Sequence, residues 1–202
     1  MSEKLRADLQ HIADSIAEGS RVLDLGCSDG SLLYYIEHEK NADGRGIDIS
    51  QSNVSHCVNN GLSVIQGDAD LDLKHYPDKC FDYVIASQIL QATKHPKEVL
   101  SQMLRISKHV IVSIPNFGHW YNRLYLSING RMPVSRALSY QWYETPNIHF
   151  CTIKDFDILC DELNAKIEDK KYLYDSGKKI SSLKRIISAN LFSQRAIFVL
   201  KG

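Results

Sequence analysis

Long apolar runs and an excess of charge of either sign are both missing from this chain of 202 residues. A helix that spans a bilayer needs about 18 to 20 consecutive apolar residues, so none is predicted. The 24 basic and 24 acidic residues cancel to a formal net charge of +0, which provides no general attraction for nucleic acid or an anionic membrane. The first residues are polar and acidic, unlike a signal peptide. We therefore expect a cytoplasmic protein that binds neither nucleic acid nor membrane.

Paired cysteines and metal-binding motifs are also missing. The 5 cysteines form no C-x-x-C pair, and the 8 histidines form no H-E-x-x-H pair. An odd number of unpaired cysteines is typical of a reducing compartment, where thiols fill small buried spaces. No structural or catalytic metal is expected. Linkers rich in Pro, Gly or Ser and internal repeats are absent as well, so residues 1–202 are predicted to form a single domain.

A loop bounded by two glycines follows the first apolar run. Residues 21–30 read Arg-Val-Leu-Asp-Leu-Gly-Cys-Ser-Asp-Gly, which predicts a buried strand and then a tight loop. A helix is predicted over residues 31–40 and a second buried strand over 44–49, with Asp48 near its end. We interpret this pattern as a nucleotide-binding β-α-β unit. In such a unit Asp48 can accept hydrogen bonds from both hydroxyls of a ribose.

The composition of the loop distinguishes between two cofactors. A dinucleotide-binding loop contains three glycines in the pattern G-x-G-x-x-G, whereas Ser28 stands between Gly26 and Gly30 and no third glycine follows. Asp24 and Asp29 would repel a pyrophosphate at short range, but they suit the amino group and positive sulfonium of S-adenosylmethionine. S-adenosylmethionine is therefore favoured over NAD, and a dehydrogenase is a less favoured alternative.

Residues 23–30 resemble motif I of the class I S-adenosylmethionine-dependent methyltransferases, although Ser28 stands where that motif usually has glycine. Further stretches are similar to one family in particular, the methionine biosynthesis protein MetW. These stretches are residues 44–50, 66–70, 87–93, 115–120, 130–133 and 145–152. The likeness extends from about Arg21 to Asp161.

Strand-like runs alternate with helical patterns, which predicts a mostly parallel sheet with helices on both faces. The runs after the first two strands are residues 63–66, 83–87, 110–114, 166–174 and 196–200. The resemblance implies a Rossmann-like methyltransferase fold of seven strands, including an antiparallel terminal strand. A polar, basic connection is expected between the last two runs.

Residues 152–155 resemble a helix capping box. The apolar stripe Leu5, Leu9, Ile12 and Ile16 predicts an N-terminal helix over residues 1–18 that serves as a lid or flank.

The candidate cofactor-binding residues lie in the loop or at the carboxyl ends of predicted strands, where such sheets bind ligands. They are Asp24, Gly26, Ser28, Gly30, Asp48, Ile49, Asp68, Ala69 and Ser87. Asp24 is expected to orient the loop or the amino group of the ligand. Asp68 could accept a hydrogen bond from the adenine amino group or could simply belong to a polar loop. Cys27 is interpreted as a small residue that the loop requires.

The segment 116–150 is predicted to be an insertion after the fifth strand. It contains both tryptophans, and its arginines are Arg123, Arg131 and Arg136. Residues 115–143 include no acidic side chain. Enrichment in aromatic residues and arginine is typical of a recognition surface, but the same residues could pack a helical hairpin over the sheet. Both interpretations stay open at this point.

Catalytic residues are poorly indicated. His119 and His149 are weak candidates for proton transfer near neutral pH, and no Ser-His-Asp or Cys-His arrangement is evident. The Asn-Pro-Pro-aromatic signature expected of amino-group methyltransferases is also absent after Ala86.

Two functions are therefore considered. The resemblance to MetW implies a methyltransferase-like protein that supports a homoserine O-acyltransferase partner, often called MetX. The alternative is a methyltransferase that acts on a small-molecule acceptor.

Overall fold

A sheet of seven strands organises the computed structural model, which describes residues 5–135 and 138–202. The strands are β1 (Arg21–Leu25), β2 (Asp43–Asp48), β3 (Val64–Gln66), β4 (Phe81–Ser87), β5 (Ser107–Pro115), β6 (Lys166–Leu173) and β7 (Arg195–Lys201). Their order in the sheet is β3-β2-β1-β4-β5-β7-β6. Only β7 runs antiparallel to its neighbours, β5 and β6. The predicted fold class is confirmed, with the last strand placed between the two that precede it.

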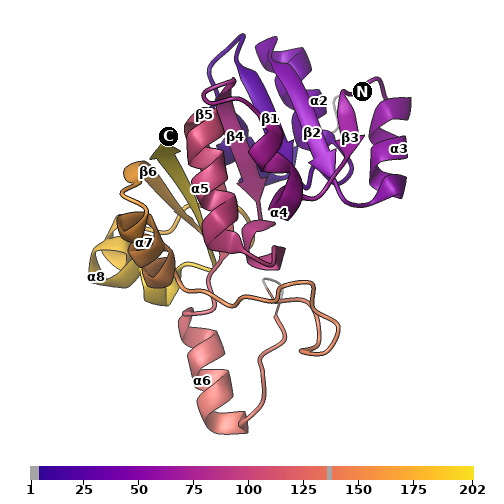
Figure 1. Ribbon diagram of the computed structural model, residues 1–202. Helices are drawn as coiled ribbons and strands as arrows, with labels where there is room; N and C mark the ends of the chain where they lie inside the picture. Colours follow the sequence, from indigo (N-terminus) through magenta and orange to yellow (C-terminus); the bar gives the residue numbers. More distant parts are fainter. Residues whose placement is uncertain (1–4, 136–137) are drawn as a thin grey trace.

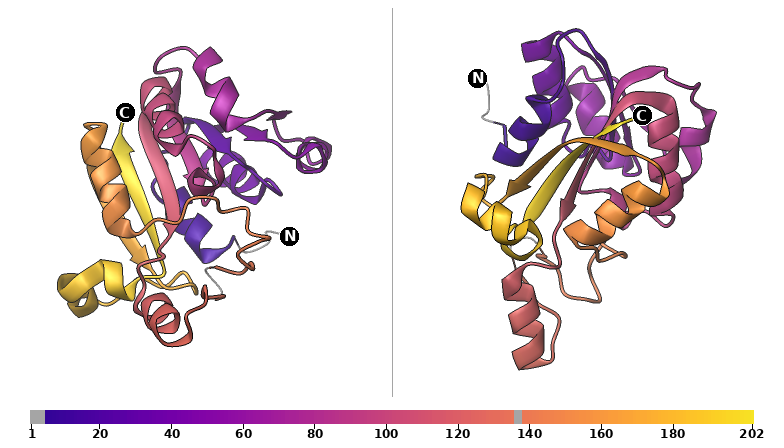
Figure 2. Two further views of the ribbon diagram at one scale, coloured as in Figure 1. Left: turned by 60° about the horizontal axis from the view of Figure 1, so that its bottom comes forward. Right: turned by 90° about the vertical axis from the view of Figure 1, so that its left-hand side faces the viewer.

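Helices cover both faces of the sheet (Figures 1 and 2). The helices α1 (Ala7–Ala13), α2 (Ser31–Lys40) and α3 (Gln51–Asn59) pack on one face. The helices α5 (Pro96–Ile106) and α7 (Ile153–Glu162) pack on the other. None of the helices within the described residues combines the length and the hydropathy required to cross a bilayer.

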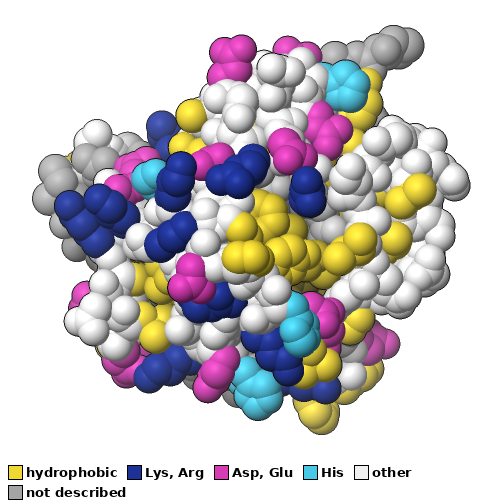
Figure 3. Space-filling model, turned by 45° about the horizontal axis from the view of Figure 1, so that its top comes forward, with side chains coloured by type: hydrophobic (Ala, Val, Ile, Leu, Met, Phe, Trp, Pro, Cys, Tyr) yellow, Lys and Arg dark blue, Asp and Glu magenta, His cyan; other side chains and the backbone are white. Residues whose placement is uncertain are grey.

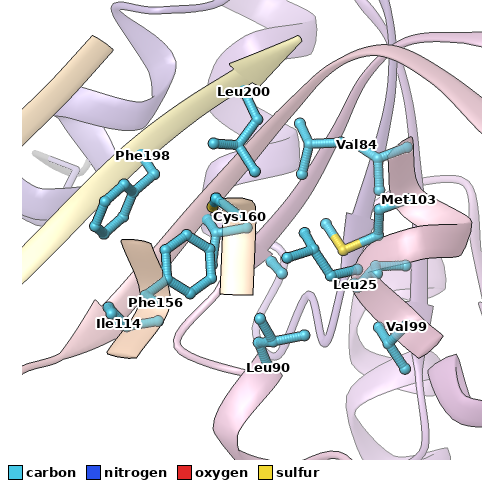
Figure 4. Close-up of a cluster of buried hydrophobic side chains, with 14 of the residues drawn as sticks. Leu25, Val84, Leu90, Val99, Met103, Ile114, Phe156, Cys160, Phe198 and Leu200 are labelled. Atoms are coloured by element: carbon cyan, nitrogen blue, oxygen red, sulfur yellow. The ribbon is translucent and has the colours of Figure 1, made fainter. Parts of the chain in front are cut away.

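The larger hydrophobic core lies between the sheet and the pair α5 and α7 (Figure 4). Met103 of α5 and Phe156 of α7 are both buried there, and the Phe156 ring lies 4.5 Å from the ring of Phe198 on β7. The central strands are buried on both faces, which explains why β5 reads as a nearly continuous apolar run. The predicted capping box begins α7, because Thr152 and Asp155 each accept the other's backbone N–H.

Short elements follow β3 and β4 at the carboxyl edge of the sheet. They are α4 (Ala69–Asp72), η1 (Leu73–His75) and η2 (Leu90–Ala92).

Charged side chains of both signs are interspersed on the face shown in Figure 3, in keeping with the zero net charge.

The structure differs from the sequence-based expectation at two places. The N-terminal helix is shorter than residues 1–18, because α1 ends at Ala13 and the chain then makes turn hydrogen bonds toward Gly19. The expected polar connection before β7 contains a helix, α8 (Ser182–Phe192), with a kink at Ser188. The kink divides α8 into short helical pieces that are marginal by themselves, so contacts with the rest of the fold decide whether they form.

One helix stands apart from the sheet. After β5 the chain forms α6 (Trp120–Asn129), which projects beyond the carboxyl ends of the strands (Figures 1 and 2). Asn122 is the one residue of α6 that is buried. The helix of the predicted insertion, residues 116–150, therefore does not pack over the sheet. Arg136 lies outside the described residues.

Gly46 of β2 lies beneath the loop that follows β1. A Cβ atom at Gly46 would lie 2.8 Å from Cys27 Sγ and 2.8 Å from Leu33 Cδ1, and both of these atoms are buried in the core. The nearby Gly44 faces the flexible end of Glu37 instead. The close packing of loop and strand therefore depends on Gly46.

We predict that Gly46→Ala lowers the free energy of unfolding by about 1–3 kcal/mol, because it overpacks a core contact. Gly44→Ala, on the same strand, should cost less than about 1 kcal/mol, since Glu37 can move aside. Urea unfolding followed by circular dichroism measures both values. Equal destabilisation by the two variants would contradict this account of the loop packing.

Candidate cofactor site

A cavity of about 600 Å³ opens at the carboxyl edge of the sheet, beside the loop that joins β1 to α2. The strand order reverses between β1 and β4, where open parallel sheets bind their ligands. Five of the residues predicted from the sequence line it together. They are Asp24, Gly26, Ser28, Gly30 and Ser87. Tyr34, His38 and His56, from α2 and α3, line it further out.

Asp24 is the most unusual side chain of the cavity. It is only 3% exposed, and burial together with the nearby carboxylates of Asp48 and Asp29 raises its pKa to about 8. Among the described residues, neither Asp24 Oδ1 nor Ser87 Oγ has a hydrogen-bond partner. A buried polar atom without a partner costs free energy, so both atoms are available to a ligand. At pH 7 the Asp24 carboxyl is mostly protonated until a cation approaches it.

The loop itself is held by backbone contacts. Ser28 has a positive φ of 53°, the conformation for which the related motif uses glycine. Its N–H donates to Asp48 Oδ2 at 2.9 Å, and its carbonyl accepts from the Cys57 thiol at 3.4 Å. At Gly30, which also has positive φ, a Cβ atom would clash with the side chains of Leu62 and Cys57. Ser28 is held in this conformation by its hydrogen bonds with Asp48 and Cys57, which fix the loop against β2 and α3.

Asp48 fixes the loop and does not line the cavity. Its Oδ1 accepts hydrogen bonds from Ser50 N at 2.9 Å and Asn53 Nδ2 at 3.2 Å, while its Oδ2 accepts from Ser28 N. A carboxylate has about four acceptor positions, so these donors leave about one. Binding both ribose hydroxyls would require Asn53 to move. The ribose role of Asp48 therefore stays a prediction.

The other predicted residues lie next to Asp48 but outside the cavity. Gly67 N donates to the Asp48 carbonyl at 3.1 Å, which brings the ends of β2 and β3 together. Asp68 caps α4 by accepting from Asp70 N, and Ala69 begins that helix. Ile49 is 70% exposed. Leu71 of α4 is 58% exposed.

Helix α1 forms a wall of the cavity through Leu5, Arg6 and Leu9. Asp8 holds this wall in place, because its carboxylate accepts from Gln88 Nε2 and from Arg195 of β7, each at 3.0 Å. Leu5 and Leu9 belong to the stripe that predicted a lid or flank. Arg6 was missed, because no local pattern shows that it would meet a loop more than 20 residues away along the chain.

The two candidate catalytic histidines are not in the cavity. His119 caps α6, with its Nδ1 accepting from Tyr121 N at 3.3 Å. His149 is exposed, its N–H donates to the Gln91 carbonyl at 3.0 Å, and its Nε2 lies 3.4 Å from the Lys94 carbonyl. These contacts give both histidines a structural use, and the structure does not place either of them beside Asp24.

A chain of hydrogen bonds joins the cavity to the segment that returns from α6. Gln88, directly after the cavity residue Ser87, donates from its side chain to Asp8. Gln91 Nε2 donates to the Gln88 carbonyl at 2.7 Å and to Asn147 Oδ1 at 3.2 Å. Helix α1, the end of β4 and the returning segment are therefore connected by polar contacts.

A family model for "Methionine biosynthesis protein MetW" matches residues 6–200. The chain belongs to the MetW family. The resemblance seen in the sequence is thereby confirmed, and the protein is associated with methionine biosynthesis. A relative from Rhodopirellula baltica, described as bifunctional methionine biosynthesis protein MetXA/MetW, is 34% identical over 186 residues. The match covers 87% of this MetW-family chain but only 30% of that relative.

Solved structures similar to this MetW-family chain share its fold. A SAM dependent methyltransferase from Archaeoglobus fulgidus has a TM-score of 0.71 at 19% identity, over 100% of this chain and 95% of that one. Phosphoethanolamine N-methyltransferase 2 from Haemonchus contortus, solved in complex with S-adenosyl-L-methionine, has a TM-score of 0.68 at 14% identity, over 96% and 51%. At such identities the likeness establishes a class I methyltransferase fold.

The raised pKa of Asp24 predicts a pH-dependent effect of Asp24→Asn on stability. Between pH 4 and 8 the unfolded chain loses the Asp24 proton while the folded protein keeps it, so folding weakens as pH rises. The advantage of Asn over Asp in free energy of unfolding should grow by about 2–4 kcal/mol from pH 5 to pH 8. Urea unfolding at both pH values measures it, with Asp161→Asn as the control for losing an exposed carboxyl. A difference independent of pH would contradict the prediction.

Proposed function

We propose that this MetW-family protein binds S-adenosylmethionine in the cavity beside Asp24 and supports a homoserine O-acyltransferase in methionine biosynthesis. The cofactor assignment rests on two buried polar atoms, Asp24 Oδ1 and Ser87 Oγ, which belong to residues that line the cavity and have no partner among the described residues. The partner role is supported by the family and by the bifunctional relative described as MetXA/MetW.

The charges around the cavity fit the amino-acid end of S-adenosylmethionine. An ammonium group beside Asp24 would favour the ionised carboxylate and satisfy Oδ1. The positive Arg6 side chain, which also lines the cavity, can attract a carboxylate. Its guanidinium is at present paired with Asp8, with Nε 2.6 Å from Oδ1, and 61% of the side chain is exposed. If Arg6 turned toward a ligand, Arg195 and Gln88 would still hold Asp8 Oδ2, and Asp8 Oδ1 would give up its hydrogen bond from Arg6.

The loop and the neighbouring strand ends would hold the adenosine. Asp48 fixes the loop and has about one acceptor position left for a ribose hydroxyl. Ile49 and Leu71 are exposed apolar side chains near the Asp48–Gly67 contact, suitable for the faces of an adenine ring. Asp68 would accept from the adenine amino group. When bound, S-adenosylmethionine supplies an activated methyl group on a positive sulfur.

The partner role is favoured over methyl transfer because the described residues offer no convincing acceptor machinery. His119 and His149 contact backbone groups and do not line the cavity. Methyl transfer depends mostly on aligning the acceptor with the sulfonium, and some acceptors need no base. A small-molecule methyltransferase is therefore the second candidate. The outer part of the cavity, near Tyr34 and His56, is the observation that favours it. Transfer of a labelled methyl group to a small molecule in cell extract would establish this alternative.

Calorimetric titration with S-adenosylmethionine tests the cofactor. At pH 7 we expect one molecule to bind and most of one proton to be released, because the ligand's ammonium ionises Asp24. The released proton is measured by repeating the titration in phosphate and in Tris. Asp24→Asn should bind at least tenfold more weakly and release no proton, whereas Asp161→Asn should match the parent. A parent protein that gives no binding heat would refute the cofactor assignment.

Acyltransferase assays test the partner role. The homoserine O-acyltransferase of the same organism is assayed alone, with this protein, and with this protein plus S-adenosylmethionine. We expect the rate to change on adding the protein and to change again on adding the cofactor, because a ligand that favours one state of the complex shifts its population. Asp24→Asn should keep the first effect and lose the second. Identical rates in all mixtures would count decisively against the proposal.

A further inference from the structure

We infer that the projecting segment after β5 is the docking surface for the acyltransferase, an inference that rests on the function proposed above. The segment, named here the arm, comprises residues 117–135 and 138–150. Its features are a fixed base, an apolar helix face that nothing in the described structure covers, and an excess of positive charge, with Glu144 as its one acidic side chain.

The base of the arm is held by buried asparagines. Asn116 Nδ2 donates to the carbonyls of Asn190 at 2.9 Å and Ser193 at 2.7 Å, and its Oδ1 accepts from Gly118 N at 3.0 Å. Asn122 Nδ2 donates to the Phe117 carbonyl at 3.2 Å. Both side chains are at most 3% exposed. Buried amides with all these partners fix the direction in which α6 leaves the sheet, so the arm is preorganised for binding.

The helix of the arm presents an apolar face to solvent. Trp120, Leu124 and Ile128 recur every four residues and are 45%, 50% and 72% exposed. Tyr121 and Tyr125 lie beside this stripe, with ring centroids 6.0 Å apart. An α-helix turns about 100° per residue, so these five side chains span about 140° of the surface. A face of that width normally packs against another element.

The length of α6 strengthens the argument. The helix has 10 residues and proper ends, with His119 as its N-cap and Gly130 at its C-terminus. Helices shorter than about 12–15 residues are marginal in water, and most of their stability in proteins comes from packing one face. Since α6 buries only Asn122, its face is suited to a surface outside the described chain. Trp142 and Tyr143 of the arm are also exposed, at 71% and 66%.

The acyltransferase is favoured over a second copy of this chain by charge. A two-fold contact between two arms would place the same surface on both sides. The interface would then contain Arg123 and Arg131 from both copies, and Glu144 is the one acidic side chain of each arm that could pair with them. A different protein with an apolar groove and acidic rim fits better. The bifunctional relative combines MetXA and MetW in its name, which supports the acyltransferase as that protein.

Ile128→Glu tests the docking surface, because it places a charge on the most exposed residue of the stripe without disturbing the base. Ile158→Glu is the matched control: Ile158 is 56% exposed on α7, away from the arm. Biolayer interferometry with the immobilised acyltransferase should show at least a tenfold loss of affinity for Ile128→Glu and less than a twofold change for Ile158→Glu. Both variants should keep the parent's melting temperature and its affinity for S-adenosylmethionine.

The outcomes separate the inference from the function on which it rests. If the parent protein binds no acyltransferase, the proposed function fails and the docking surface with it. If the parent and both variants bind equally, the function stands and the arm is not the docking surface. Sedimentation velocity supplies the remaining comparison: a parent dimer that Ile128→Glu dissociates, with acyltransferase binding unchanged, would assign the arm to a second copy and overturn the inference.

Discussion

The carboxyl group of Asp24, buried at the centre of the sheet, constrains the rest of the site. Burial and the nearby carboxylates of Asp48 and Asp29 favour its protonated form, so the cavity holds a group that a cation would ionise. Cys27, Ser28 and Gly30 wrap the loop around it, and Asp48 fixes that loop from the next strand. A buried acid without a partner at Oδ1 weakens folding, and such a cost is typical of residues kept for binding.

Helix α1, the end of β4 and strand β7 are joined at one wall of the cavity. Asp8 near the N-terminus pairs with Arg195 of β7, and Gln88 at the end of β4 completes the contact. Asp8 is 2% exposed, so these hydrogen bonds offset the cost of burying its charge. The position of α1 over the cavity therefore depends on a contact with β7, whose Arg195 is 187 residues away from Asp8 along the chain.

The arm and the cavity are connected through Gln91. This side chain links the Gln88 carbonyl to Asn147, on the segment that returns from α6. Gln91 is 4% exposed, which makes its hydrogen bonds sensitive to any shift at the end of β4. A ligand that contacts Ser87 thus has a short polar route to Asn147 in the returning part of the arm. In the function proposed above, this route would let S-adenosylmethionine, a product downstream of methionine, influence how a partner is held.

The order of strands and helices could be predicted from the sequence, because parallel strands buried on both faces read as apolar runs and α7 begins with a capping box that is visible in the sequence. The loop residues Asp24 to Gly30 and Ser87 could be predicted as a site, since glycines and strand ends carry local signals. Tertiary structure alone decided that Arg6 reaches the cavity, that Asp48 is engaged by Ser28 and Asn53, that α8 forms, and that α6 projects uncovered. Each of these depends on contacts between distant parts of the chain, for which a local sequence pattern carries no signal.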